Sequence, residues 1–292
     1  MKITVIGATG KVGALTVKKL LNRGFVVRAL VRNPTRALER LGTHDNLELW
    51  SGQLDDAGMV RSALTGVDAA FVAMGSIGAE GELQASIIAE AKEAKLPQYF
   101  RLSVLNTSTV SLGTNQQAHA KIDYVAETAG IPYTTLRPTI FSSVILDGAR
   151  EIRETGVWTR LAEHGRVGLI DYRDVADVAA TIIEYPDLWG RHWELTGPRL
   201  VNWQELVDLL SAELGRTITF RTVDEGTFFE LLVEGGVLDI QARRLVTMEL
   251  ALEAGENGRL TENVARLAGH RPRTVEEFLH DNREAFLPSG VN

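Results

Sequence analysis

The chain has 292 residues, which is long enough for one large domain or two modest ones with a substantial buried core. Its formal net charge is −7, from 31 basic and 38 acidic residues without long runs of one sign, and this argues against a dedicated nucleic-acid surface. The absence of cysteine excludes disulfides, thiolate zinc sites, iron–sulfur clusters and cysteine nucleophiles.

No apolar run approaches the roughly 20 residues that a membrane helix needs. The predicted first strand begins at Met1, so we expect no signal or transit peptide. We therefore expect a cytoplasmic globular protein without membrane or direct nucleic-acid contacts, and we predict no metal site.

The chain opens with MKITVIGATGKVG, in which a strand at 1–6 leads into three regularly spaced glycines and then a helix at 14–23. Gly7 would permit a tight turn, Gly10 would let backbone N–H groups approach a pyrophosphate, and Gly13 would let the helix pack near the strand. The helix N-terminus favours anionic phosphates. Because strand, glycine turn and helix follow in this order, we predict a dinucleotide site that includes Gly7, Ala8, Thr9, Gly10, Lys11, Val12 and Gly13.

The residue after the second strand indicates which dinucleotide binds. An acidic residue there binds the ribose hydroxyls of NAD, whereas a basic residue accommodates the 2′-phosphate of NADP. The segment VRALVRNPTR has Arg32 in this slot, and Lys11 adds positive charge near the phosphates. Arg32 could instead cap a helix or face solvent. The pattern favours NADP, with NAD as the alternative.

The first half of the chain continues to alternate apolar and amphipathic runs. Further strands are predicted at 25–31, 47–50, 69–73, 99–103 and 133–137, and further helices at 34–41, 56–64, 80–94 and 116–129. Several strands are apolar almost throughout, as is typical of strands that are covered on both faces. We therefore predict an α/β fold with a doubly wound parallel sheet of the Rossmann type.

The periodic pattern weakens after Pro138. Residues 139–172 predict a loop-rich segment, after which a helix at 171–185 and a strand at 192–195 return to the main sheet. Helices are then predicted at 202–214, 224–234, 237–253, 261–267 and 274–286. We predict an NAD(P)-binding Rossmann domain formed by 1–138, to which 171–195 return. A smaller, mainly helical C-terminal lobe for the substrate would comprise 139–170 and 196–292.

Several longer segments resemble one known family. They are GATGKVG, VRALVRNP, GQLDDAGMVRSALTGVDAAFVA, TAGIPYTTLRPTIF, DYRDVADVAATII and RTVEEFLHDNREAF. In this order and spacing they resemble the NmrA-like, atypical branch of the short-chain dehydrogenase/reductase superfamily over nearly the whole chain. The resemblance implies an NAD(P) cofactor and a relation to bacterial NADPH-dependent quinone reductases. More distant relatives are of the isoflavone-reductase type or are redox-sensing transcriptional co-regulators.

Typical members of this superfamily use a Tyr-x-x-x-Lys pair after the fifth strand to relay a proton to a carbonyl oxygen. Here those slots hold Asn115 and His119. Asn115 cannot act as an acid near neutral pH, whereas His119 could donate a proton or contact cofactor or substrate. Quinone-reductase relatives are similar, with a histidine followed four residues later by an acidic residue, matched by His119 and Asp123. His119 is therefore the candidate catalytic residue, and we expect Lys121 to face solvent.

Ligands of parallel sheets bind beyond the carboxyl ends of the strands. We expect the cofactor groove to be lined by residues that follow three strands, namely Ala73, Met74, Gly75 and Ser76, then Ser103, and then Thr139, Ile140 and Phe141. Gln53 occupies a slot where relatives place an acidic residue near adenine, and with Leu54 beside it we include it in the cofactor site.

Three aromatic residues of the second lobe, Trp158, His164 and Phe228, are candidates for a substrate wall, with core packing as the alternative. For Asp174, which matches a recurring position of the family, we expect a structural or helix N-terminal role.

Three functions fit these patterns. The first is an NAD(P)H-dependent oxidoreductase that reduces a quinone or a similar conjugated aromatic small molecule. The second is a non-catalytic NAD(P) redox sensor or regulator of the NmrA type. The third is a tailoring oxidoreductase or oxygenase of aromatic polyketide-like natural-product biosynthesis. The missing Tyr-x-x-x-Lys pair favours the second and third, and the apolar second lobe favours the first and third. A homodimer is left open.

Overall fold

Seven parallel strands form the central sheet in the order β3-β2-β1-β4-β5-β6-β8. The computed structural model describes residues 1–287. The strands are β1 (Lys2–Ile6), β2 (Val26–Val31), β3 (Leu47–Ser51), β4 (Ala69–Val72), β5 (Tyr99–Leu102), β6 (Tyr133–Pro138) and β8 (His192–Leu195). The strand order reverses at β1, whose neighbours are β2 and β4. The doubly wound parallel sheet is thus confirmed, including the predicted return of the strand near residue 192.

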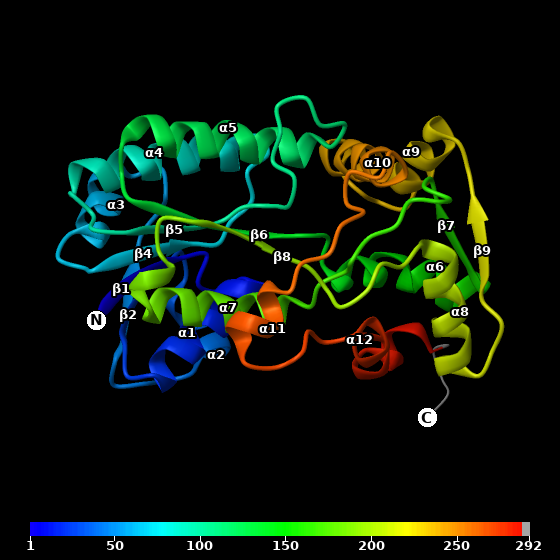
Figure 1. Cartoon of the computed structure of the whole chain (residues 1–292), viewed down its shortest axis with the longest axis horizontal. Helices are drawn as coiled ribbons and strands as arrows, with labels where there is room; N and C mark the ends of the chain where they lie inside the picture. Colours follow the sequence, from blue (N-terminus) through cyan, green and yellow to red (C-terminus); the bar gives the residue numbers. More distant parts are fainter. Residues whose placement is uncertain (288–292) are drawn as a thin grey trace.

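Helices cover both faces of this sheet (Figure 1). One face carries α1 (Lys11–Asn22), α2 (Pro34–Leu41), α7 (Tyr172–Glu184) and α11 (Asn263–Ala268). The other carries α3 (Ala57–Leu64), α4 (Ala79–Glu93) and α5 (Thr114–Ala129). Within β1, Ile3 and Val5 belong to the core on the first face and Ile6 to the core on the second. This burial on both faces explains why the strands are apolar almost throughout.

The second lobe lies beyond the carboxyl ends of the strands (Figure 1). It contains η1 (Ser142–Gly148), α6 (Ala149–Thr155), β7 (Val157–Arg160), α8 (Trp203–Leu214), β9 (Thr219–Thr222), α9 (Glu225–Glu234), α10 (Asp239–Glu253), α12 (Val275–Asp281) and η3 (Arg283–Phe286). A short turn of helix, η2 (Pro186–Leu188), joins α7 to β8 in the main sheet.

Two predictions for this lobe were wrong in part. The segment 139–172 is not mainly loop, because it contains η1, α6 and β7. Within this segment, β7 pairs in parallel with β9, which lies about sixty residues later in the chain. A partner so distant in the sequence leaves no local pattern from which the strand could be predicted. The predicted helix 274–286 ends at Asp281 and continues as the separate short helix η3.

The second lobe has its own core, which is built around Trp158, Trp203 and Phe278. One helix departs from the predicted division of the chain. Although α11 lies within 196–292, its Val264 and Leu267 belong to the core of the main sheet. The boundary between a cofactor domain and a substrate lobe otherwise stays a prediction. Within residues 1–287, every helix is too short or too polar to cross a bilayer.

Candidate functional site

A cavity of about 480 Å³ lies at the carboxyl ends of the central strands. The main sheet contributes the glycine turn and the segments that follow β4, β5 and β6, and the second lobe contributes η1 and α10. Among the predicted cofactor residues, the lining includes Gly10, Lys11, Val12, Gly13, Ala73, Met74, Gly75, Ser103, His119, Thr139 and Phe141, together with Ile140. The cavity therefore brings together segments that are far apart in the sequence.

The remaining predicted cofactor residues do not line this cavity. Gly7, Ala8 and Thr9 form the turn that precedes the lining residues, and Arg32, Gln53 and Leu54 follow the ends of β2 and β3. These two strands are neighbours, with Val31 paired with Ser51, so Arg32 and Gln53 lie at the same edge of the sheet. Their contact with the adenosine half of a dinucleotide stays a prediction.

Arg32 is exposed, and its side chain forms no hydrogen bond or ion pair within residues 1–287. It does not cap α2, because that helix is capped by Asn33, whose side chain accepts the backbone N–H of Arg36. The alternative of a helix cap is therefore wrong, and the guanidinium of Arg32 faces solvent at the end of β2.

The glycine turn has the geometry that close backbone packing requires. Gly7 has φ +78°, and a Cβ atom there would lie 2.1 Å from the carbonyl oxygen of Ala73. A Cβ atom on Gly13 would lie 2.1 Å from the carbonyl oxygen of Gly7, so only glycine lets α1 pack this close to the turn. Gly10 is the N-cap of α1 and has no side chain to cover the first N–H groups of the helix. These groups fit an anionic phosphate at the cavity.

His119 lies on α5 and is 4 % exposed. Its Nδ1 atom is 2.8 Å from Nη2 of Arg101 and 3.2 Å from Oγ of Ser76. Because a guanidinium can only donate, Nδ1 is the acceptor, and the proton of the neutral ring is on Nε2. Burial lowers the pKa of His119 well below its usual value, and the charge of Arg101 lowers it further. The imidazole is thus a neutral hydrogen-bond donor in the cavity wall, since protonation to imidazolium is disfavoured.

A buried polar network lies behind His119 and is centred on Arg101 of β5. The Arg101 side chain is fully buried, and its Nε donates to Oε1 of Gln84 at 2.8 Å. Its Nη2 donates to Oγ of Ser76 at 3.0 Å, and Nη1 pairs with the carboxylate of Asp123. Asp123 also accepts Nη2 of Arg137 at 2.9 Å.

Sequence reasoning missed the roles of Arg101 and Gln84 in this network. The available signal was a charged residue within the otherwise apolar strand YFRL, because a buried arginine needs partners. Ser76, which we expected in the groove, is instead buried next to His119.

The two residues of α5 at the positions of the usual tyrosine and lysine lie as their spacing predicts. Asn115 and His119 are one helical turn apart, and both line the cavity. Lys121 is exposed and does not line the cavity, which confirms that it faces solvent.

The predicted aromatic wall was wrong. Trp158 is 1 % exposed and packs against Trp203, with ring centroids 5.5 Å apart, and Phe228 is also buried. The side chain of His164 is 80 % exposed. None of the three predicted wall residues lines the cavity, because Trp158 belongs to the core of the second lobe, Phe228 is buried and His164 faces solvent. Within the described chain, the lobe instead contributes Ser143, Val144, Asp147, Arg244, Leu245, Met248 and Asn257.

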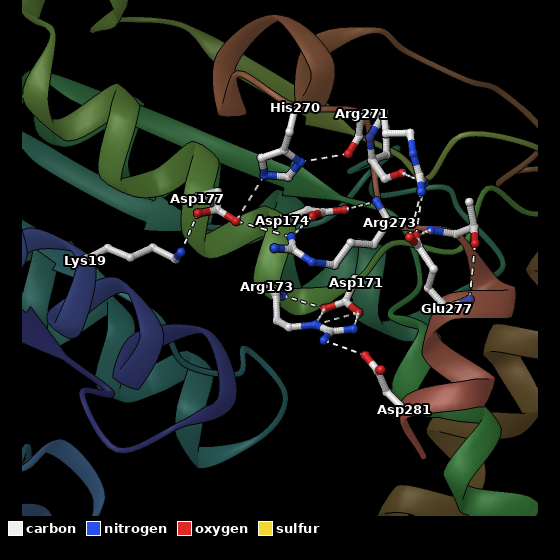
Figure 2. Close-up of polar contacts among 12 residues, drawn as sticks. Lys19, Asp171, Arg173, Asp174, Asp177, His270, Arg271, Arg273, Glu277 and Asp281 are labelled. Carbon is white, nitrogen blue, oxygen red and sulfur yellow. Dashed lines mark hydrogen bonds and ion pairs between the residues drawn. The ribbon is translucent and has the colours of Figure 1, made fainter. Parts of the chain in front are cut away.

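A second polar cluster lies on α7, outside the cavity (Figure 2). The carboxylate of Asp174 accepts the backbone N–H of Arg273 at 2.7 Å and pairs with its guanidinium. Asp177 pairs with Lys19 of α1 and lies 3.3 Å from Nε2 of His270. Ligand atoms of Asp174, Asp177 and His270 lie within 4.8 Å of one another, but two cations already balance the carboxylates. The cluster ties the C-terminal segment to α1 and α7, which is a structural role for Asp174.

The amino-acid sequence is similar to those of several named oxidoreductases along most of its length. It is 25 % identical over 97 % of its length to an NAD(P)H azoreductase of Xenophilus azovorans, of which 99 % is covered. It is 26 % identical over 94 % of its length to quinone oxidoreductase 2 of Escherichia coli strain K12, of which 96 % is covered.

The fold is also similar to a solved structure, the NADPH-dependent quinone oxidoreductase QOR2 of Escherichia coli complexed with NADPH. The TM-score is 0.89 at 24 % identity, with 96 % of this chain and 99 % of that chain covered. A family model described as the NmrA-like family matches residues 1–279. The chain therefore belongs to the NmrA-like family.

Proposed function

We propose that the protein is an NAD(P)H-dependent oxidoreductase that prefers NADP(H) and reduces a quinone or a similar conjugated aromatic small molecule. The observation that carries the proposal is a single cavity lined both by the glycine turn and by the second lobe. A phosphate-binding turn and a substrate wall thus share one space, as hydride transfer requires. The similarity to an azoreductase and a quinone oxidoreductase supports this class of substrate.

Residues of this chain would hold the cofactor from two sides. The N-terminus of α1 and Lys11 would bind the pyrophosphate, and Arg32 would bind a 2′-phosphate. Nζ of Lys11 is 3.2 Å from Oγ of Ser143 in η1, which joins the two lobes at the cavity. Two buried polar atoms of lining residues, Oγ1 of Thr139 and Nδ2 of Asn257, have no partner within residues 1–287, which fits a site for a polar ligand.

The chemistry divides between the cofactor and the protein. When bound, a reduced nicotinamide would supply the hydride. The Nε2–H of His119 would donate a hydrogen bond to the acceptor oxygen and stabilise the negative charge that develops there. Asn115, one turn away on the same helix, cannot replace the missing tyrosine as an acid. His119 therefore orients and polarises the substrate.

The proposal is tested by cofactor binding and turnover together. Calorimetric titrations with NADP⁺ and NAD⁺ should give tighter binding of NADP⁺, and Arg32→Ala should weaken NADP⁺ binding much more than NAD⁺ binding. NADPH oxidation, followed by absorbance with a panel of quinones and azo compounds, should show turnover of at least one acceptor. Tight NADP(H) binding without turnover of any acceptor would contradict the enzymatic proposal.

That contrary result would favour the second candidate, a redox sensor of the NmrA type. The observation in its favour is Asn115, which occupies the position of the usual proton-relay tyrosine. A sensor would distinguish NADP⁺ from NADPH in affinity, and with NADPH it would reduce neither the quinones of the panel nor a set of polycyclic aromatic substrates.

A further inference from the structure

The proposed reduction consumes a proton for every hydride that is transferred. His119 is poorly suited to supply this proton, because its Nδ1 is held by Arg101 and its pKa is lowered well below the usual value. A neutral imidazole that gives up its Nε2 proton becomes an imidazolate, which is a much stronger base than a quinone product requires. Another group at the cavity should therefore provide the proton.

Asp147 is an acidic group of the second lobe that lines the same cavity. It lies in η1, and its side chain is exposed, so a ligand in the cavity can reach it. Within residues 1–287 its carboxyl group accepts no hydrogen bond and forms no ion pair. This distinguishes Asp147 from Asp123 and Asp174, whose carboxylates are bound by arginines.

Three cations from three other elements face Asp147, and each has another contact. Arg160 of β7 pairs with the buried Glu249, and Nε of Arg244 donates to Oε1 of Gln241 at 2.9 Å. Lys11 of α1 contacts Ser143. Partial burial of Asp147 against the cavity wall raises its pKa although the side chain still reaches solvent, and these three cations oppose the rise only in part. The carboxyl group thus keeps its proton to a higher pH than an aspartate in water.

Resting on the proposed function, we propose that the carboxyl group of Asp147 donates the proton to the substrate during reduction in this cavity. The O–H bond of Asp147 breaks and a new O–H bond forms on the substrate oxygen. A bound reduced nicotinamide would supply the two electrons and the hydrogen as hydride. Quinone, hydride and proton together give the hydroquinone. Because the Asp147 side chain is exposed, water then returns the proton to its carboxylate.

Cofactor binding should increase the fraction of Asp147 that is protonated and so able to donate. Phosphates held by Lys11 would offset the positive charge that now lowers the pKa of Asp147, and would therefore raise this pKa further. Asp147 should then take up a fraction of a proton when NADP⁺ binds. This linkage can be measured without any turnover.

The test combines calorimetry and pH profiles for the wild type, Asp147→Asn, Asp147→Glu and the control Asp187→Asn. Asp187 is an exposed aspartate outside the cavity. NADP⁺ titrations between pH 5 and 8, in two buffers of different ionisation enthalpy, measure proton uptake. Uptake should occur in the wild type and in Asp187→Asn and disappear in Asp147→Asn.

The turnover measurements test whether Asp147 donates the proton. Wild-type kcat should be highest at low pH and fall as pH rises through the pKa of Asp147, because only the protonated acid donates. Asp147→Asn should lower kcat by about 100-fold or more and remove this decline, as expected for the loss of a general acid. Asp147→Glu should restore the decline.

Different results would contradict the role of Asp147 as proton donor and the proposed function. If the wild type reduces a quinone and Asp147→Asn retains its kcat, its alkaline decline and its proton uptake, only the role of Asp147 is wrong. If the wild type binds NADP(H) but reduces no acceptor, the proposed function is wrong and the proton-donor proposal falls with it. A misfolded Asp147→Asn would be recognised by lost NADP⁺ binding. The kcat and the pH profile of Asp147→Glu would then test the role of Asp147.

Discussion

At the residue scale, the polar side of the cavity depends on Arg101. Its guanidinium is fully buried, yet it is matched by the carboxylate of Asp123 and by neutral acceptors on Gln84, Ser76 and His119. A buried arginine without such partners would be costly. The network therefore serves the stability of the fold and also determines which nitrogen of His119 carries the proton.

Replacing Arg101 by methionine should change both properties. Asp123 would lose one of its two arginines, and the free energy of unfolding in urea should fall by about 3 kcal/mol. The pKa of His119, measured by NMR titration, should rise toward its usual value because the positive charge that lowers it is gone. The control is Arg243→Met, which removes an exposed arginine paired with the exposed Asp239 and should cost less than about 1 kcal/mol. Equal losses in the two variants would contradict the network described for Arg101.

At the scale of elements, the site is placed by the ends of strands and the start of one helix. The turn between β1 and α1 brings the N-terminus of α1 to the cavity. The glycine spacing of this turn could be recognised in the sequence, because only glycine fits the two close approaches at Gly7 and Gly13. Short strands such as β7 could not be predicted from the sequence, because the strand with which β7 pairs comes much later in the chain.

The close packing at Gly13 leads to a prediction for α1. Gly13→Ala would place a methyl group against the carbonyl oxygen of Gly7, which must push α1 away from the turn. We expect a loss of about 1 to 3 kcal/mol in unfolding free energy and at least tenfold weaker NADP⁺ binding by calorimetry. The matched control is Gly58→Ala near the start of α3, where the new Cβ would meet only Oδ1 of Asp56 at 3.5 Å. It should be neutral or stabilise by up to about 1 kcal/mol. Unchanged NADP⁺ affinity in Gly13→Ala would show that α1 does not hold the phosphates.

At the scale of the whole molecule, the C-terminal segment joins the two cores. It passes from α10 in the second lobe to α11 on the main sheet, and then returns through Arg273 to α12 in the second lobe (Figure 1). The cluster on α7 fixes this path, since Asp174 is fully buried and holds both the backbone and the side chain of Arg273 (Figure 2).

Removal of the Arg273 side chain should therefore weaken the whole fold. Arg273→Gln leaves Asp174 with the backbone N–H of residue 273 but without its guanidinium partner. Unfolding followed by both circular dichroism and tryptophan fluorescence should show a loss of about 2 to 3 kcal/mol. Arg271→Gln removes an exposed pair with Glu277 and should change stability by less than about 1 kcal/mol. A loss in Arg273→Gln no larger than in this control would contradict the structural role of the cluster.

The sequence by itself determined the doubly wound sheet, the glycine turn and the family. These features depend on local periodicity and on residue types, such as glycine, that few other residues can replace. It also placed His119 on the face of α5 that meets the site, because i and i+4 positions of a helix share a face.

Only the tertiary structure decided which groups meet in the cavity. The sequence allowed Trp158 and Phe228 either as a substrate wall or, as each alone favoured, as core, and the packing of the second lobe buried both. The nitrogen of His119 that carries the proton follows from its contact with Arg101 of β5, and the place of Asp147 follows from the docking of η1 against the main sheet. Contacts between distant segments, burial and the resulting electrostatics have no local periodicity, so they became visible only when the chain was folded.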